Sequence, residues 1–389
     1  MTMASTIPSS CLRWGFLVLL CSALGTGNGD SRIMATAFAM SSTPSQGSNH
    51  QQEFKGNSLD ARGNRYQSLN STIPTAAEAA RSVGVEPPLE ASSKTWKRAW
   101  VVHRTALPYL HQFDKLAPLD SSLCLICLWW KALSGNDPSS PVYDERLHFD
   151  MLPSTTRRIL TVTRRRGYPR LHHANVEIRT AYLNRAVQRA ADQVQQDAST
   201  TTPPPKKKKI RLISMGAGYD LRSVRFRLAG HIDEAFELDL PEVVDAKQRL
   251  LTQRLLKRRP ELTADLLPTM YPVNLNNVSQ FESTLRDIFV QDQDDDWHTI
   301  FLFEAVMIYL NEGIPTSLLQ ICRRVLENDE TGGTLCFADR LENIPGADLD
   351  MAQSVLPATG WEIVEWQPKP GLARHMGMLQ PLSLDQPSR

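Results

Sequence analysis

The stretch Ile210-Arg-Leu-Ile-Ser-Met-Gly-Ala-Gly-Tyr-Asp220 decides which fold this sequence predicts. Its first six residues predict a short buried strand, and Gly216 and Gly218 follow at once. Glycine lets the backbone turn tightly and pass close to a ligand, and a helix that starts after such a turn offers free N–H groups. The apolar spacing over 221–228 predicts that helix. A strand, a glycine turn and a helix in this order are typical of a nucleotide-binding unit.

A second predicted strand supplies the acid that such a unit needs. Residues 235–240 contain Glu237 and Asp239, which lie 19 and 21 residues beyond Gly218. At this separation a carboxylate reaches the ribose hydroxyls of a ligand that is bound over the first turn. The third glycine of the dinucleotide fingerprint is missing, so the glycine turn alone is weak evidence. The strands, the helix and the acids around it support the nucleotide-binding interpretation. The sequence leaves open which of the two acids meets the ribose.

Strand-like and helix-like segments continue to alternate after this unit. The strands are expected over 271–275, 298–303 and 334–338, the helices over 281–289 and 314–326, and a closing hairpin over 361–366 and 374–379. This alternation predicts an α/β fold, a doubly wound Rossmann-like sheet that binds its ligand at the carboxyl ends of the strands. Helical periodicity from Ser93 onward, with an amphipathic helix over 174–191 and a loop over 195–205, predicts a helical cap before the sheet.

Composition and charge exclude several classes of protein. Lys+Arg 43 against Asp+Glu 42 gives a net charge of +1, which argues against the broad basic field of a nucleic-acid binder. No apolar run reaches about 18 residues, so no membrane span is expected. Cys124 and Cys127 have the CxxC spacing but lie in an apolar run without a second ligand pair, which predicts core packing and no metal.

The first 92 residues differ in character from the rest of the chain. Residues 14–24 form an apolar run of 11 residues after Arg13, which is typical of a signal peptide. The step Ala35-Thr-Ala-Phe38 follows, and it resembles the cleavage step in the two-part presequences of algae with secondary plastids. We expect a presequence over 1–40, a disordered linker over 41–92, one folded domain over 93–389 and a plastid location, with secretion as the alternative.

Five segments, in this order and spacing, carry a resemblance to a known family. They are Lys97-Arg98 with Pro108-Tyr-Leu-His-Gln-Phe113, Arg166-Gly-Tyr168 with Arg170, Met215-Gly-Ala-Gly-Tyr-Asp-Leu-Arg222, Phe236-Glu-Leu-Asp-Leu-Pro241 and Phe303-Glu-Ala-Val-Met-Ile-Tyr-Leu310. Together they resemble the leucine carboxyl methyltransferases, enzymes that use S-adenosylmethionine to esterify carboxylates. The resemblance implies a class I methyltransferase sheet and S-adenosylmethionine as the cofactor.

The resemblance also implies a donor site. Its residues would be Lys97, Arg170, Gly216, Gly218, Glu237, Asp239, Asn274, Leu275, Glu304 and Tyr309. Lys97 and Arg170 would pair with the donor's methionine carboxylate, with Arg179 as the alternative to Arg170. Asn274 stands where the family commonly has an aspartate near the adenine. The sulfonium is already activated and carboxylates are ionised at pH 7, so proximity and orientation carry the reaction, and neither a general base nor a metal is expected.

The acceptor is less closely specified. The resemblance implies a protein C-terminus, such as the C-terminal leucine of a protein phosphatase 2A catalytic subunit. Residues 368–377 are unlike the phosphatase-directed enzymes, which leaves a small carboxylic or hydroxylated plastid metabolite as the alternative. A donor-binding protein without turnover is a further alternative. We expect a monomer.

Overall fold

The chain divides into two units, Met1–Thr72 and Ile73–Arg389. The computed structural model describes part of the second unit: residues 118–138, 140–164, 170–200, 208–290, 296–328, 332–339, 341, 349–369 and 374–382. The expected presequence, the linker and Lys97 therefore lie outside the described residues, as do 108–113 and Arg166-Gly-Tyr168. Within the described part, no helix is long and apolar enough to cross a membrane.

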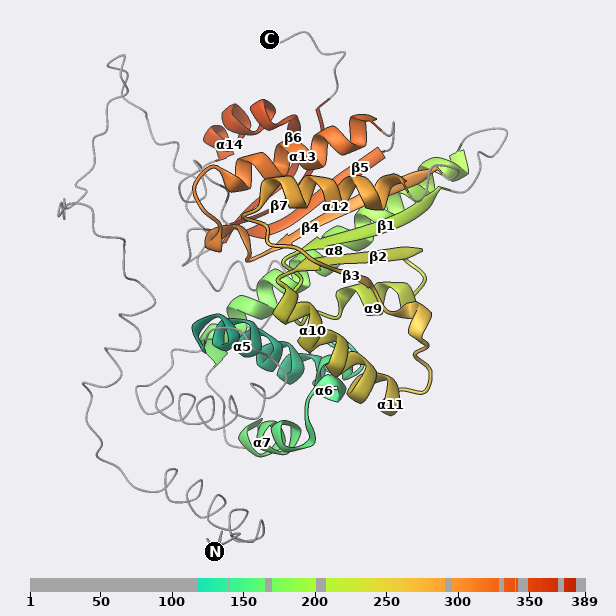
Figure 1. The fold of residues 1–389 in the computed structure, drawn as a ribbon, viewed down its shortest axis with the longest axis vertical. Helices are drawn as coiled ribbons and strands as arrows, with labels where there is room; N and C mark the ends of the chain where they lie inside the picture. Colours follow the sequence, from blue (N-terminus) through green and yellow to red (C-terminus); the bar gives the residue numbers. More distant parts are fainter. Residues whose placement is uncertain are drawn as a thin grey trace, which may run out of the picture. The chain divides into compact units, whose positions relative to one another are not determined.

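Seven strands form one sheet in the order β3-β2-β1-β4-β5-β7-β6 (Figure 1). They are β1 Lys209–Met215, β2 Glu234–Asp239, β3 Thr269–Pro272, β4 Trp297–Glu304, β5 Gly332–Asp339, β6 Trp361–Lys369 and β7 Arg374–Pro381. Strands β1 to β5 pair in parallel, and β7 runs antiparallel between β5 and β6. The predicted doubly wound Rossmann-like sheet is confirmed. Its strand order reverses beside β1, and at such a point an open α/β sheet binds its ligand.

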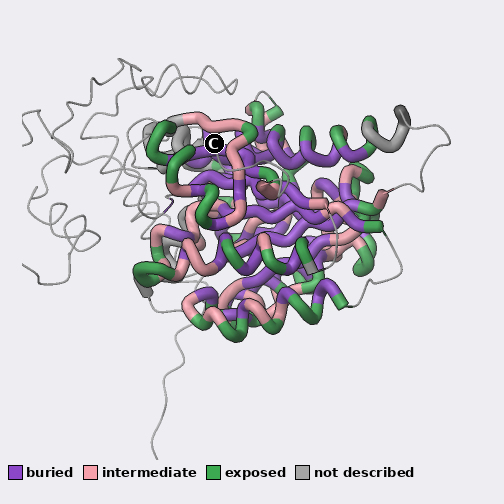
Figure 2. The backbone as a smooth tube through the Cα atoms, turned by 90° about the horizontal axis from the view of Figure 1, so that it is seen from above, coloured by how far each residue is buried: buried purple, intermediate pink, exposed green. Residues whose placement is uncertain are grey.

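Helices cover both faces of this sheet. The helices are α5 Pro118–Gly135, α6 Leu147–Met151, α7 Ser154–Arg164, α8 Arg170–Thr200, α9 Arg222–Leu228, α10 Pro241–Leu250, α11 Leu256–Arg258, α12 Val278–Val290, α13 Ile314–Asn328 and α14 Leu349–Val355. A π-helical turn, Leu251–Leu255, joins α10 to α11. Viewed from above, the central strands are largely buried and the outer turns of the helices are exposed (Figure 2), whereas the edge strand β3 has no fully buried residue.

Alternation along β1 assigns its side chains to two separate cores. Ile213 and Met215 pack with α12 and α13 on one face, whereas Ile210 and Leu212 pack with α8 and α9 on the other. A third core lies between α5, α6, α10 and the π-helical turn. This third core joins the helical cap to the carboxyl ends of β1 and β2, so the cap helices stand beside the expected ligand position.

Several element boundaries differ from the prediction by a few residues, and prolines lie close to two of them. Helix α8 extends to Thr200, so residues 195–200 of the predicted loop 195–205 are helical, whereas 201–205 lie outside the described residues. Three consecutive prolines follow at 203–205, and a proline disfavours the helical conformation in the residue before it. Strand β3 was predicted over 271–275 but spans Thr269–Pro272. It is an edge strand, and Pro272 has no N–H to continue the ladder. Asn274 and Leu275 therefore lie in the turn that follows it.

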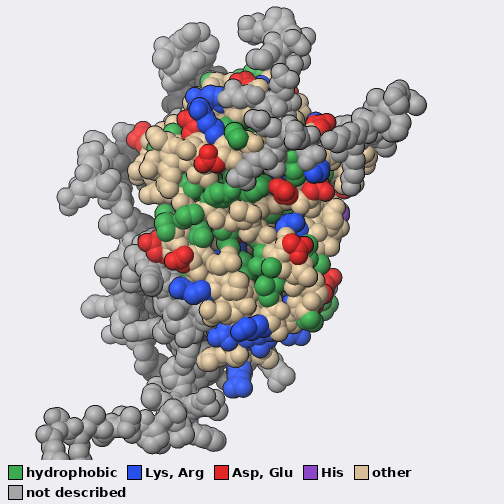
Figure 3. All heavy atoms as spheres, turned by 45° about the vertical axis from the view of Figure 1, so that its right-hand side comes forward, with side chains coloured by type: hydrophobic (Ala, Val, Ile, Leu, Met, Phe, Trp, Pro, Cys, Tyr) green, Lys and Arg blue, Asp and Glu red, His purple; other side chains and the backbone are tan. Residues whose placement is uncertain are grey.

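The surface carries both signs of charge. On the face in Figure 3, acidic and basic side chains are both present, with apolar side chains gathered between them. This face has no single-signed field, in keeping with a net charge of +1.

Candidate functional site

The turn after β1 has a backbone conformation that favours glycine at two positions. Gly216 has φ 61° and Gly218 has φ 52°. A Cβ at position 216 would lie 2.3 Å from Cγ2 of Val306, whereas a Cβ at position 218 would meet nothing within 4 Å. The N–H of Gly216 donates to the carbonyl of Leu238 at 2.8 Å. Gly216 thus allows close packing against the loop after β4, and Gly218 leaves open space beside the turn.

Asp239 ends β2 and is bonded to this turn. Its Oδ2 accepts the N–H of Gly218 at 2.6 Å, and its Oδ1 accepts the N–H of Leu240 at 2.7 Å. Burial raises the pKa of Asp239 to about 6, although both hydrogen bonds favour the ionised form. The side chain is partly exposed, and among the described residues no cation lies within ion-pair distance of it. Such a carboxylate has spare acceptor capacity for hydroxyl groups.

Glu237 occupies a different environment from Asp239. It is 2% exposed, and its Oε2 lies 2.5 Å from Nζ of Lys247 in α10. Burial raises the pKa of Glu237, and the neighbouring ammonium opposes that effect. Lys247 also donates to the carbonyl oxygen of Asp220 at 2.5 Å. Glu237 therefore belongs to a closed ion pair that supports the residues after the glycine turn.

Glu304, the last residue of β4, is surrounded by cations. Its Oε1 accepts from Nε of Arg179 at 2.8 Å, and its Oε2 accepts from Lys131 at 3.0 Å and from Arg222 at 2.9 Å. Burial alone would raise the pKa of Glu304, but the three cations hold it well below its usual range. Together with Asp220 these residues form what we call the charged cluster: Lys131, Arg179, Asp220, Arg222 and Glu304.

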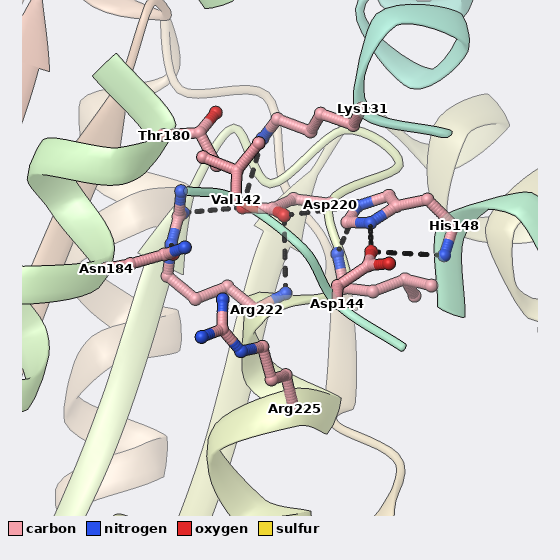
Figure 4. Close-up of a pocket in the computed structure, with 10 residues that line it drawn as sticks. Lys131, Val142, Asp144, His148, Thr180, Asn184, Asp220, Arg222 and Arg225 are labelled. Carbon is pink, nitrogen blue, oxygen red and sulfur yellow. Dashed lines mark hydrogen bonds and ion pairs between the residues drawn. The ribbon is translucent and has the colours of Figure 1, made fainter. Parts of the chain in front are cut away.

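Asp220 connects the charged cluster to the glycine turn. Its Oδ2 accepts from Nη1 of Arg222 at 2.5 Å and lies 3.3 Å from Nζ of Lys131. Burial opposes ionisation, but the Arg222 guanidinium and the Lys131 ammonium hold the pKa of Asp220 well below its usual range. A cavity of about 20 Å³ lies beside this residue (Figure 4). That volume accommodates about one water molecule, so this cavity is not itself a nucleotide site.

Three further predicted residues, Asn274, Leu275 and Tyr309, lie in the segments that follow β3 and β4. Asn274 is exposed, and its Oδ1 accepts the N–H of Asn276 at 3.0 Å. Leu275 is buried in the core against α12. Tyr309, in a 3-10 turn after β4, is 56% exposed.

The two arginine candidates lie on one helix. Arg170 is the first residue of α8, whereas Arg179 bonds to Glu304 at the carboxyl end of β4. Nine residues separate them, which is about 13 Å along a helix axis. Arg179 is therefore engaged within the charged cluster.

Several residues of this region were not predicted from the sequence. Lys131 and His148 carried no motif, although a lysine directly after Trp129 and Trp130 is a sign of a buried charge. Asp220 and Arg222 stood in the motif without an assigned role. Asp220 and Arg222 bond to each other, but their other partners, Lys131, Asn184 and Glu304, come from distant parts of the chain.

The prediction of core packing for the cysteine pair holds for one member only. Both cysteines are half-buried; Cys124 packs against the third core, whereas Sγ of Cys127 accepts from Nη2 of Arg179 at 3.4 Å. Arginine at this position gives the thiol a polar neighbour that the apolar run did not reveal. In the part of the chain that the structure describes, no group of three or more His, Cys, Asp or Glu side chains is placed to hold a metal ion.

Comparison with known proteins adds to this geometry. Residues 125–322 match the family model for leucine carboxyl methyltransferase. No curated protein matches the sequence. Among solved structures, magnesium protoporphyrin IX methyltransferase from Synechocystis PCC 6803 with bound S-adenosylmethionine is 12% identical and aligns over 56% of this chain and 86% of its own, with a TM-score of 0.35. An O-methyltransferase family protein from Burkholderia thailandensis is 14% identical, over 82% of this chain and 91% of its own, with a TM-score of 0.29.

The family match covers half of the chain. It includes the glycine turn, both acids of β2 and every member of the charged cluster. This chain therefore belongs to the leucine carboxyl methyltransferase family, whose members are S-adenosylmethionine-dependent methyltransferases.

Proposed function

We propose that the protein transfers the methyl group of S-adenosylmethionine to a carboxylate oxygen, with the donor bound over the turn after β1. The observation that carries this proposal is the pairing of Gly218 with Asp239. A side chain at position 218 would point into open space, and the Asp239 carboxylate lies 2.6 Å from the same residue's N–H. The residues present therefore fit a nucleoside that needs a close backbone and an acceptor for its ribose hydroxyls.

Each part of the site has a separate task in this proposal. Asp239 accepts the ribose hydroxyls, and Asn274 offers a neutral amide to the adenine. Lys97 and Arg170 pair with the methionine carboxylate. The charged cluster keeps the turn rigid, because Asp220 and Glu304 share the same two cations, Lys131 and Arg222. When bound, the donor supplies an activated methyl group.

The acceptor is a carboxylate in this proposal. A carboxylate is already ionised at pH 7, so the protein has no proton to remove from it. What remains for the protein is to hold one oxygen in line with the methyl group and to exclude the water that would solvate that oxygen. Arg179, Lys131 and Arg222 give the neighbourhood of Glu304 a positive excess that favours an anionic acceptor.

Within the carboxylates we propose a protein C-terminus, with the C-terminal leucine of a phosphatase catalytic subunit as the specific candidate. The order and spacing of the motif segments support this choice. The test is transfer of labelled methyl groups from S-adenosylmethionine to a peptide ending in that leucine, with an amidated peptide of the same sequence as control. Base-labile label on the free acid alone supports the proposal.

Two other outcomes of that experiment would change the assignment. Label that enters only a small-molecule fraction of a plastid extract would establish a metabolite methyltransferase. Donor binding measured by calorimetry, without product from the peptide or from the extract, would establish a binding protein without turnover.

We also propose that residues 1–92 direct the protein to a plastid through the secretory pathway. The apolar run 14–24 and the Ala35-Thr-Ala-Phe38 step support this. Fusion of residues 1–92 to a fluorescent protein, with Phe38→Ala as the comparison, tests it. Plastid fluorescence that the substitution abolishes is the expected result, and secretion of both fusions would contradict it.

A further inference from the structure

An unusual backbone segment before α6 holds one carboxylate in place. Glu145 has φ 55° and Arg146 has φ 72°, a left-handed conformation that L side chains rarely adopt. The carboxylate of Asp144 lies where Gly135 lacks a side chain, because a Cβ there would be 2.2 Å from Oδ1 of Asp144. The carbonyl of Gly135 also accepts the N–H of Arg146 at 3.1 Å. Two strained residues and one bare glycine thus fix the position of Asp144.

This carboxylate orients a buried histidine. Oδ2 of Asp144 bonds to Nδ1 of His148 and also accepts the backbone N–H of His148 at 3.3 Å. Both residues are buried. Figure 4 shows the imidazole between the Asp144 carboxylate on one side and Asp220 on the other. The two ring nitrogens of His148 therefore face different partners, and the second nitrogen faces the residues that follow the glycine turn.

The second ring nitrogen contacts that segment directly. Nε2 of His148 accepts the N–H of Leu221 at 3.1 Å and lies 3.4 Å from Oδ1 of Asp220. An amide that donates to Nε2 requires this nitrogen to be unprotonated, so the proton of the neutral ring lies on Nδ1, toward Asp144. Leu221 is three residues beyond Gly218 and is the N-cap of α9. His148 therefore fixes the backbone next to the expected donor position.

Protonation of His148 would reverse this arrangement. The cationic ring would donate from Nε2 to Asp220, and the N–H of Leu221 would lose its acceptor. Asp220 is already bonded to Arg222 and lies within ion-pair distance of Lys131, so a third cation would compete with both. Burial lowers the pKa of His148, but Asp144 and Asp220 outweigh it and raise the pKa above 6.5.

The groups facing His148 come from every element around it. Those that line the same cavity are Lys131 of α5, Asp144 before α6, Asp220 after β1, and Arg222 and Arg225 of α9. Among these side chains and His148 itself, the imidazole is the group whose ordinary pKa lies near neutrality. A change in the ring's charge is therefore the event near pH 7 that would alter this set of contacts.

We propose that the Asp144–His148 pair is a positioning device for the donor turn, and that the neutral ring holds the turn in its donor-binding form. This inference rests on the proposed donor site at Gly218 and Asp239. Its consequence is that donor affinity falls as His148 becomes protonated. His148 does not touch the reacting atoms in this scheme; it acts through the amide of Leu221 and through Asp220.

The test is calorimetric binding of S-adenosylhomocysteine to the full chain between pH 5 and 8.5. For the wild type we expect the dissociation constant to rise roughly 5- to 10-fold on acidification through the His148 pKa, the effect of one lost hydrogen bond. A second rise near pH 6 belongs to Asp239. His148→Gln retains a neutral acceptor near the place of Nε2, so the upper rise should disappear while the lower one remains. His148→Ala should bind about 5- to 10-fold more weakly than His148→Gln at pH 8.

A control variant and a measurement of folding complete the test. His231→Gln removes a histidine that contacts Phe226 instead of the turn, and it should reproduce the wild-type profile. Thermal melting at pH 8 must show that each variant is folded. A full acid response in His148→Gln, or wild-type affinity in a folded His148→Ala, would overturn the positioning role alone. No binding by the wild type at any pH would remove the proposed donor site and this inference with it.

Discussion

Lys247 of α10 and Glu237 of β2 form an ion pair at 2.5 Å in which both side chains are at most 3% exposed. The pair is adjacent to the residues that follow the glycine turn, because Lys247 also donates to the carbonyl of Asp220. A buried pair of this kind gives little net stability, but removal of one partner leaves an uncompensated charge in the core. The pair therefore couples the second strand, α10 and the turn.

The first prediction concerns this pair. Lys247→Met should lower the free energy of unfolding by about 3–5 kcal/mol, because Glu237 is left buried without its cation. The double variant Glu237→Leu/Lys247→Met should recover most of that loss. Chemical denaturation at pH 7.5 measures both. A double variant no more stable than Lys247→Met would show that the charge is not the cause.

The second prediction separates the two acids of β2. Asp239→Asn should raise the dissociation constant for S-adenosylhomocysteine roughly 5- to 30-fold, because it loses the charge-assisted part of the bond to the ribose, about 1–2 kcal/mol. Glu237→Gln is the matched control on the same strand, and it should change stability more than affinity. Calorimetry on both variants decides. The reverse ranking would assign the ribose contact to Glu237.

The third prediction follows from the pKa of Asp239. Because its folded-state pKa is raised to about 6, the ionised carboxylate destabilises the fold, and this cost appears as pH rises from about 4 to 6 and is full above that window. Asp239→Asn should therefore raise the melting temperature of the ligand-free protein at pH 8 by about 2–4 °C. This corresponds to a net stabilisation of about 1 kcal/mol, once the loss of one hydrogen bond from a backbone N–H is subtracted. The gain should vanish below pH 4. An equal gain at pH 3.5 and pH 8 would contradict the electrostatic cause.

The fourth prediction contrasts the two glycines of the turn. Gly218→Val should abolish donor binding while costing about 1–2 kcal/mol for the left-handed conformation, since its side chain enters open space. Gly216→Ala should destabilise the protein more, because its Cβ would overlap Val306; Val306→Ala in the same chain should recover only part of that loss, since the Cβ of residue 306 would itself lie 2.8 Å away. Melting curves and calorimetry test the pair. Unchanged donor affinity in Gly218→Val would remove this turn from the site.

The fifth prediction concerns acid stability. The folded-state pKa of Glu304 is depressed, so its contribution is complete above about pH 4.5 and is lost as pH falls through the folded pKa. Glu304→Gln should lower the free energy of unfolding at pH 7 by about 3–5 kcal/mol, because three buried cations lose their shared carboxylate. Denaturation at pH 7 and at pH 3 should show the difference between the two proteins shrinking. A constant difference would exclude this linkage.

The succession of strands and helices along the chain, the glycine turn and the position of Asp239 at the end of a strand followed from the sequence, because each depends on local pattern and short spacing. Periodicity identifies a buried strand, and about 20 residues of crossover bring its successor alongside. The prediction of a loop was wrong over 195–200, where Gln195, Gln196 and Ala198 continue helix α8.

The charged cluster could not be predicted in the same way. Lys131 and Glu304 are 173 residues apart in sequence, and Arg179 and Glu304 are 125 apart. The local sequence around each of these residues does not indicate its partner. They are brought together because α5, α8 and β4 pack against one another in the fold. The left-handed residues Glu145 and Arg146 likewise carry no sequence signal, because neither is a glycine or an asparagine.

The place of β7 between β5 and β6 has a consequence for synthesis on the ribosome. Strand β5 ends at Asp339, but its antiparallel neighbour is complete only at Pro381, 42 residues later. At about 5–20 residues per second, the free edge of β5 waits roughly 2–8 seconds for its partner. An unpaired edge strand is a template for other chains, so nascent molecules on one messenger are at risk of joining through β5 during that interval. A truncated chain that ends before Arg374 would leave the edge of β5 unpaired permanently.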